Sequence, residues 1–135
     1  MNNEIILAAR LLLAALFLIF GWRKLRDFSG TVSQMVQLKI PTPVLAAGIA
    51  TFMELPVSFA IAVAAFTRPL ALLMFLYTLG TALIGHRFWT VDDAERVDSM
   101  DSFFKDLSIM GGFLLLFVTG PGKYSTDVLF NLPSL

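Results

Sequence analysis

The chain has 135 residues, of which 57% are hydrophobic and 15% charged, and its formal net charge is zero. Soluble domains carry about 25% charged residues, so this composition excludes an ordinary water-soluble domain. Zero net charge gives no overall field that would attract nucleic acid, and the absence of cysteine excludes thiol chemistry and cysteine-ligated metal sites by this chain alone. No change of composition divides the chain, so we expect one domain over residues 1–135.

Four apolar segments are long enough to cross the hydrocarbon core of a bilayer as helices, which takes about 20 residues each. They are residues 5–22, 44–66, 70–85 and 103–119. The first has no basic segment before it, so we expect a retained helix and not a cleaved signal peptide. The fourth ends at Gly120-Pro121-Gly122, a strong helix terminator. The sequence therefore predicts an all-α integral membrane protein, a four-transmembrane-helix bundle.

The three connections differ in character. After the first span, apolar residues recur at helical spacing among polar ones, which predicts a short interfacial amphipathic helix; the apolar positions are Phe28, Val32, Met35, Val36 and Ile40. The second and third spans should form an antiparallel hairpin linked by Thr67-Arg68-Pro69. The acidic stretch before the fourth span is expected to be a solvated loop.

Lysine and arginine in the short connections predict the orientation, because positive residues stay on the cytoplasmic side. Seven fall on one side and two on the other; the seven are Arg23, Lys24, Arg26, Lys39, Arg87, Arg96 and Lys105. We therefore predict that both termini are periplasmic.

Ionisable side chains inside a span are costly in lipid and are kept mostly where they pair or line a cavity. Counting about 1.5 Å per residue from the cytoplasmic ends, Arg10 lies roughly 18 Å and Glu54 roughly 16 Å into a core of about 30 Å. The two side chains could therefore pair. Such a pair could line a polar pocket that holds a proton, a carbonyl or an anion, or it could only fix helix register. Thr51 and Ser58 share a helical face with Glu54, and Pro56 could kink the helix beside it.

His86 is the only histidine and lies at the cytoplasmic end of the third span. Because imidazole changes charge near neutral pH, it could relay protons or donate to a quinone carbonyl, alone or with Lys105 and Asp106. The alternative is an ordinary polar residue at a helix end. One histidine without cysteine provides neither a two-histidine haem site nor a convincing zinc site, so we expect no metal site.

The order of these features resembles the DoxX family of small four-helix bacterial inner-membrane proteins over nearly the whole chain. The resemblance is carried by Arg10, the run 16–21 with Lys24-Leu25, Glu54-Leu55, Thr67-Arg68, the segment 86–89, the segment 104–107, Gly111-Gly112, and the segment 119–122 with Tyr124-Ser125 and Asp127. It implies a multi-pass protein of the bacterial inner membrane, linked to quinol oxidase, thiosulfate:quinone oxidoreductase or other redox assemblies. The family's recurrent polar positions coincide with Arg10, Glu54, Arg68 and His86, whereas Asp106 stands where asparagine is common.

Three functional hypotheses follow. The leading one is a membrane-embedded accessory component of a redox system, with a quinone headgroup or a proton held by Arg10, Glu54 and His86. The chain has no intrinsic cofactor on this hypothesis, and electrons would come from a partner oxidoreductase complex or a bound quinone. The alternatives are a small proton-coupled transporter or channel, for which four spans suggest a homodimer, and a ligand-free scaffold or assembly factor. Whether the chain is an enzyme, and which residues would be catalytic, stays open.

Overall fold

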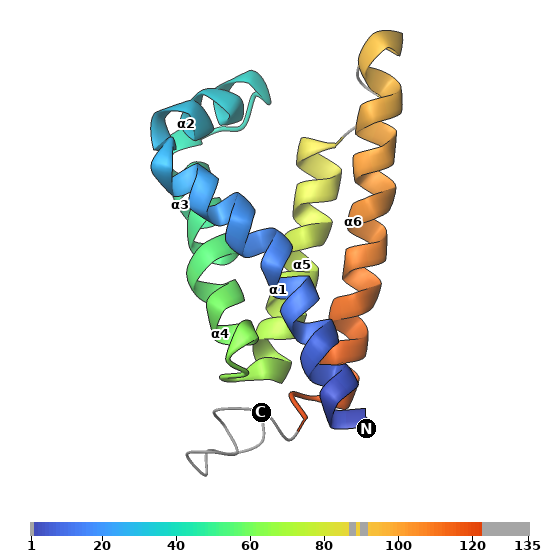
Figure 1. The fold of residues 1–135 in the computed structure, drawn as a ribbon. Helices are drawn as coiled ribbons and strands as arrows, with labels where there is room; N and C mark the ends of the chain where they lie inside the picture. Colours follow the sequence, from blue (N-terminus) through green and yellow to red (C-terminus); the bar gives the residue numbers. More distant parts are fainter. Residues whose placement is uncertain (1, 87–88, 90–91, 123–135) are drawn as a thin grey trace.

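The computed structural model describes residues 2–86, 89 and 92–122, and the regular elements in this part of the chain are all helices. They are α1 (Asn2–Arg26), α2 (Phe28–Gln37), α3 (Pro43–Phe52), η1 (Met53–Val57), α4 (Ser58–Ala62), α5 (Thr67–Gly85) and α6 (Asp93–Thr119) (Figure 1). Four helical stretches are long and apolar enough to cross a membrane: Asn2–Arg26, Pro43–Ala62, Thr67–Gly85 and Arg96–Thr119. The prediction of an all-α protein with four spans is confirmed.

The second span is one helix with a π-helical segment in its middle. α3 continues through η1, the π-helical residues Met53–Val57, into α4. Pro56 lies inside η1, and because proline has no backbone N–H it cannot make the regular helical hydrogen bond. The predicted irregularity beside Glu54 therefore takes the form of a wider helical turn.

Several predicted boundaries were wrong. Thr67-Arg68-Pro69 is not a linker but the first turn of α5, where backbone amides need no helical partner and proline is tolerated. The turn lies at 63–66 instead, where Ala64 and Phe66 adopt positive φ angles of 59° and 51°. α6 begins at Asp93, because acidic residues are favourable near a helix N-terminus and no glycine or proline interrupts the segment. The predicted acidic loop is therefore largely helical.

The short helix between the first two spans is confirmed as α2. Asp27 caps its N-terminus by accepting a hydrogen bond from the Gly30 amide at 3.2 Å. Its polar residues Ser33 and Gln34 are exposed, whereas the apolar side of the helix is partly covered and packs against α3.

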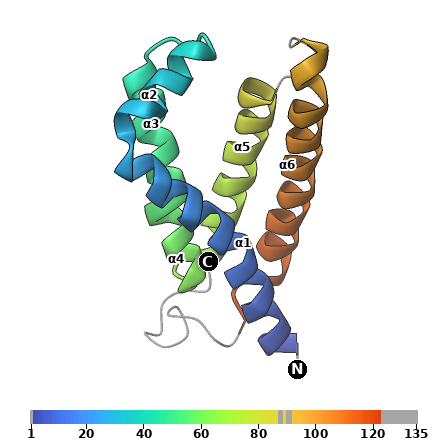
Figure 2. The same cartoon turned by 45° about the horizontal axis from the view of Figure 1, so that its top comes forward.

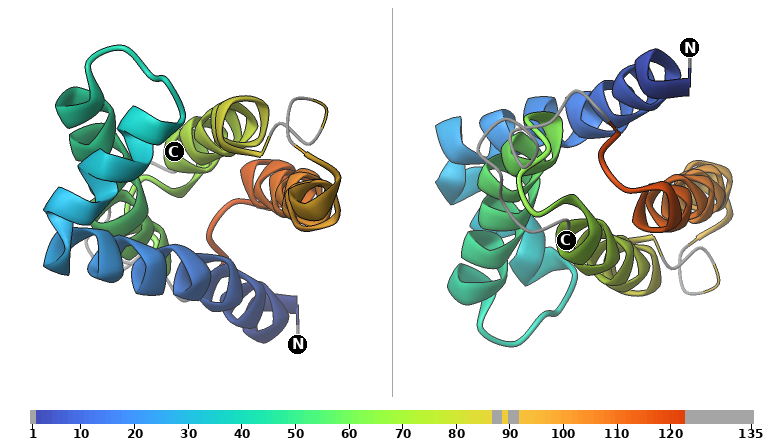
Figure 3. Two further views of the ribbon diagram at one scale, coloured as in Figure 1. Left: turned by 90° about the horizontal axis from the view of Figure 1, so that it is seen from above. Right: turned by 90° about the horizontal axis from the view of Figure 1, so that it is seen from below.

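The helices form two groups that meet along part of their length. α5 and α6 pack against each other extensively, and α1 runs obliquely across the molecule, contacting η1, α4 and α6 as well as α2 and α3 (Figures 1 and 2). Viewed along the bundle, α2 and α3 lie on one side and the α5–α6 pair on the other (Figure 3). No Cα atom of α3 comes within 8 Å of one in α5, so the second and third spans meet only through η1 and α4.

The core lies where the four spans converge. It is formed by Phe17, Met53, Val57, Ile61, Ala71, Met74, Phe113 and Leu116, with the Phe17 and Phe113 rings 5.7 Å apart. At Gly112 an added Cβ would lie 2.9 Å from the Leu13 side chain, so this glycine allows α1 and α6 to approach closely. Large apolar side chains such as Leu12, Leu115 and Val118 are exposed around the outside. A surface of this kind is suited to lipid and not to water.

The two ends of the described chain lie at the same end of the bundle. An added Cβ at Gly122 would lie 3.2 Å from Ile6 and 3.4 Å from Asn3, both in the first turns of α1. An even number of crossings requires this arrangement. We call this end the outer end and the opposite end, which carries α2, the inner end, after the orientation that the charges predict.

Candidate functional site

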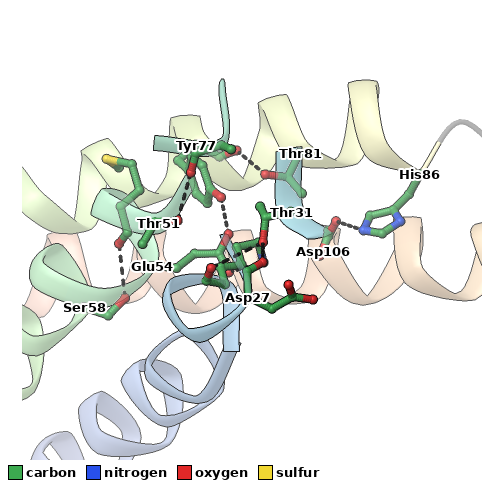
Figure 4. A network of polar contacts seen from close by, with 12 residues as sticks. Asp27, Thr31, Thr51, Glu54, Ser58, Tyr77, Thr81, His86 and Asp106 are labelled. Carbon is green, nitrogen blue, oxygen red and sulfur yellow. Dashed lines mark hydrogen bonds and ion pairs between the residues drawn. The ribbon is translucent and has the colours of Figure 1, made fainter. Parts of the chain in front are cut away.

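A buried carboxylate joins three of the four spans. Glu54 lies on η1 with 4% of its surface exposed, and Lys24 of α1 places its Nζ 2.8 Å from Glu54 Oε1. Tyr77 of α5 donates its hydroxyl to Glu54 Oε2, as Figure 4 shows. These contacts give the carboxylate one charged and one neutral donor, from opposite sides. We call Lys24, Glu54 and Tyr77 the Glu54 site.

Local backbone structure explains how these side chains meet. An added Cβ at Gly21 would lie only 2.7 Å from the carbonyl carbon of Glu54, so α1 and η1 touch backbone to backbone there. Lys24 follows Gly21 by three residues and therefore lies on the same face of α1. Ser58 Oγ donates to the Met53 carbonyl across the π-helical turn at 3.4 Å. The wide turn and the glycine together place the carboxylate within reach of the lysine.

A pocket at the corner between α1 and α2 is lined in part by Lys24, the basic member of this ion pair. Its volume is about 380 Å³, and its lining residues are Phe20, Arg23, Lys24, Asp27, Gly30, Thr31 and Gln34. The Phe20 ring centroid lies 5.7 Å from Lys24 Nζ and 5.9 Å from the Arg23 guanidinium carbon, within range of cation–π attraction. The Lys24 side chain is 23% exposed and that of Glu54 6%. Lys24 thus connects a pocket at the inner end with a carboxylate deeper inside; we call this hollow the interfacial pocket.

A second pair of a basic and an acidic side chain, His86 and Asp106, lies toward the inner end. His86 Nε2, at the C-terminus of α5, is 3.5 Å from Asp106 Oδ2 on α6, and this oxygen is buried without a hydrogen-bond partner in the described part of the chain. Thr81 lies one turn beyond Tyr77 on the way to His86, and its hydroxyl donates to the Tyr77 carbonyl at 3.0 Å (Figure 4). The predicted polar cluster around His86 therefore includes Asp106. Lys105 is exposed and has no ion pair among the described residues.

The predicted pairing of Arg10 with Glu54 is wrong. Arg10 is 2% exposed and lies near the outer end, where its Nε donates to the Ala62 carbonyl at 3.2 Å and its Nη1 to the Pro121 carbonyl at 2.7 Å. The predicted depths of Arg10 and Glu54 in the membrane assume that the first span ends at Trp22 and runs parallel to its neighbours. α1 instead continues to Arg26 and crosses obliquely, which brings Gly21 and not Arg10 beside Glu54. Sequence reasoning thus placed Glu54 correctly inside a span and gave it the wrong partner.

Two members of the Glu54 site were not predicted. Lys24 was used as a cytoplasmic charge and as part of the family resemblance but was given no place in a site, although its long side chain can reach inward from a helix end. Tyr77 lies in an apolar span and was not predicted to belong to a site. A tyrosine hydroxyl buried in lipid needs a hydrogen-bond partner, and this requirement could have identified it as a site residue. Thr51 and Ser58, which were predicted to share a helical face with Glu54, are buried as Glu54 is, but their hydroxyls donate to the Ala47 and Met53 carbonyls and not to Glu54.

The chemistry available to these residues is proton exchange and recognition of a polar ring or carbonyl. Glu54 can accept a proton, Lys24 and Tyr77 can donate hydrogen bonds, and the interfacial pocket has the volume of a small ligand site. In the part of the chain that the structure describes, no three histidine, aspartate or glutamate side chains converge as a metal ion would require.

Comparisons with known proteins agree on the family. The family model described as DoxX matches residues 5–87, more than half of the chain. The chain is 47% identical over 123 residues to the Escherichia coli K12 inner membrane protein YphA, covering 91% of this chain and 88% of that protein. It is 39% identical over 126 residues to the inner membrane protein YqjF of the same strain, covering 93% and 92%. No solved structure matches the chain. The chain therefore belongs to the DoxX family.

Proposed function

We propose that this protein is an accessory component of a redox system in the bacterial inner membrane, and that it binds a quinone headgroup at the Glu54 site. Both bacterial relatives are named inner membrane proteins, which supports the location. The observation that carries the proposal is one buried carboxylate held by donors from two other helices, one of which, Lys24, also lines the interfacial pocket.

The residues of the site fit such a headgroup. A quinone headgroup is a flat ring with two carbonyl oxygens, and it accepts two electrons and two protons on reduction to the quinol. Lys24 and Tyr77 supply an N–H and an O–H donor that can turn from Glu54 to a carbonyl oxygen. Phe20 offers an apolar ring face in the interfacial pocket. An isoprenoid tail would lie in lipid beside α1.

Glu54 has the role of a proton carrier in this proposal. Its carboxylate can take up a proton released in the site and pass it on, because Lys24 is partly exposed to the interfacial pocket. The His86–Asp106 pair lies between the Tyr77 level and the inner end, and it would exchange protons with the aqueous side. The chain has no cysteine and one histidine, so we propose that a partner oxidoreductase supplies the electrons.

Quinone retention tests the proposal. Protein is purified in mild detergent, its lipids are extracted, and quinone is measured per mole of protein. We expect quinone to accompany the wild-type protein and a Glu4→Gln control at the outer end, and to be lost from Glu54→Gln and Tyr77→Phe. A wild-type preparation with no more quinone than Glu54→Gln would overturn the proposal.

One observation favours a proton-coupled transporter as a second candidate. α3 does not contact α5, so the Glu54–Tyr77 hydrogen bond joins the second span to α5 at the place where the contact between them ends. Protonation of Glu54 would remove its negative charge and so weaken the ion pair with Lys24. Proton-driven solute flux in proteoliposomes that Glu54→Gln abolishes and Glu4→Gln preserves would support this candidate. Recovery of an oxidoreductase from native membranes, without quinone or flux, would instead support the scaffold hypothesis.

A further inference from the structure

A second group of polar side chains lies at the outer end, remote from the Glu54 site. It consists of Arg10 on α1 and of Thr67 and Arg68 in the first turn of α5, and we call it the outer basic cluster. Arg10 and Arg68 both lie against the segment that ends α6, because Arg10 donates to the Pro121 carbonyl and Arg68 lies beside Gly120; Thr67 directly precedes Arg68 on α5. The quinone proposal uses none of them.

The charge of Arg10 is not balanced by a carboxylate. Its two hydrogen bonds go to the backbone carbonyls of Ala62 and Pro121, and no acidic side chain among the described residues lies within 4.0 Å. The guanidinium is 2% exposed, so water does not replace the missing counter-charge. A buried cation with only neutral partners creates a strongly positive local potential.

Arg68 and Thr67 add hydrogen-bonding groups that are not used. Arg68 Nε is buried and has no hydrogen-bond partner in the described structure, and the same is true of Thr67 Oγ1, whose residue is fully buried. Buried polar groups are nearly always satisfied, so each of these two groups needs a partner that the described residues do not supply, and an oxygen atom of a ligand would meet that need. Both are able to donate to an oxygen atom.

The backbone of α5 also favours a negatively charged ligand at this end. Thr67 and Arg68 form the N-terminus of the 19-residue helix α5, where the helix dipole favours negative charge. The N-cap residue, Phe66, has no side chain that could cap the helix amides. The absence of a side chain at Gly120 leaves room for the Arg68 guanidinium, since a Cβ added at Gly120 would lie 3.0 Å from Arg68 Nε and 3.1 Å from Nη2.

We propose that the outer basic cluster binds the phosphate group of an anionic ligand. A guanidinium matches the geometry of phosphate oxygens, and a second guanidinium, a hydroxyl and a helix N-terminus add to the same attraction. The cluster lies at the end of the spans, at the level where phospholipid headgroups lie in a bilayer. An anionic phospholipid and free inorganic phosphate share this chemistry, and the experiment separates them.

The test uses delipidated full-length protein in a neutral detergent. Phosphatidylglycerol or phosphatidylcholine is added and the lipids retained per protein are counted by native mass spectrometry; inorganic phosphate is compared with chloride at equal ionic strength by thermal unfolding. The variants are Arg68→Gln and Thr67→Val, and the control is Arg26→Gln, which removes an exposed arginine at the inner end that does not line the interfacial pocket. Arg10 is left intact because it also holds two helix ends together.

We expect phosphatidylglycerol to bind in preference to phosphatidylcholine, and to bind about tenfold more weakly to Arg68→Gln than to the control. If inorganic phosphate raises the unfolding temperature of the wild-type protein but not of Arg68→Gln, the ligand is free phosphate. That result would equally support a phosphate site at the outer basic cluster. Equal phosphatidylglycerol retention and equal phosphate response in Arg68→Gln and Arg26→Gln would overturn the proposed site. Circular dichroism of each variant shows that it is folded, and quinone content should stay at the wild-type level in all of them.

Discussion

Replacing Gly21 by alanine should separate α1 from η1 and lower stability. The new Cβ would lie 2.7, 2.8 and 2.9 Å from backbone atoms of Glu54 and Leu55. Non-bonded carbon atoms prefer about 3.5 Å or more, so the two backbones must part by roughly 0.8 Å. Neither is a flexible side-chain end that could swing away. Overpacking of this kind costs about 1–3 kcal/mol.

The chain offers a matched control for this substitution. An added Cβ at Gly111 of α6, or at Gly80 of α5, meets no atom within 4 Å. Alanine in place of glycine inside a helix gains about 0.5–1 kcal/mol from backbone entropy, and this gain is common to all three variants. The difference between Gly21→Ala and Gly111→Ala therefore isolates the overpacking term, which should be about 1–3 kcal/mol.

The difference can be measured by unfolding each variant with sodium dodecyl sulfate from mild-detergent micelles, followed by tryptophan fluorescence and circular dichroism. Free energies of unfolding are compared at one detergent composition. If Gly21→Ala proves as stable as Gly111→Ala, the backbone contact between α1 and η1 does not exist as described, and the account of how Lys24 reaches Glu54 is refuted.

Three further predictions concern the Glu54 site and the orientation. Tyr77→Phe should lower the free energy of unfolding by about 1–2 kcal/mol in the same assay, because Glu54 loses a donor in a buried position; unchanged stability would count against that hydrogen bond. Lys24→Met should destabilise the protein, and adding Glu54→Gln should restore part of the loss, because the unpaired buried charge disappears; additive effects in this double-mutant cycle would contradict the ion pair. In a chain that lacks native cysteine, Asn2→Cys should react with an impermeant maleimide from the periplasm and Ser33→Cys only after permeabilisation; the reverse pattern would invert the orientation.

The number of spans could be predicted from sequence because a lipid core requires about 20 apolar residues per crossing, and four segments of the chain meet that requirement. The span limits were less accurate, since a helix can extend beyond the apolar stretch that crosses the membrane: α6 begins at Asp93, before the predicted span of residues 103–119. The sequence also identified the ionisable side chains that are too costly to expose to lipid, since Arg10 and Glu54 are both buried inside the bundle.

The partners of these residues could not be predicted, because pairing depends on tilt and register. The tilt and register of α1 decide whether Arg10 or the segment from Gly21 to Lys24, which begins 11 residues later, lies beside Glu54, and no local sequence signal fixes the angle at which α1 crosses. The contact between His86 and Asp106 was easier to anticipate, since both residues were expected at the same end of neighbouring spans.

The hydrogen bond between Arg10 and Pro121 has a consequence for biosynthesis. Its two residues are 111 positions apart, so the first helix enters the membrane long before the ribosome has made the carbonyl that its guanidinium will meet. Until the last helix is inserted, the only hydrogen-bond acceptors for the Arg10 guanidinium are the Ala62 carbonyl, which is nearer in sequence, and water at the bilayer surface. We expect the first helix to sit shallowly or near the insertion machinery during that interval, and to settle at its final depth only when the chain is complete.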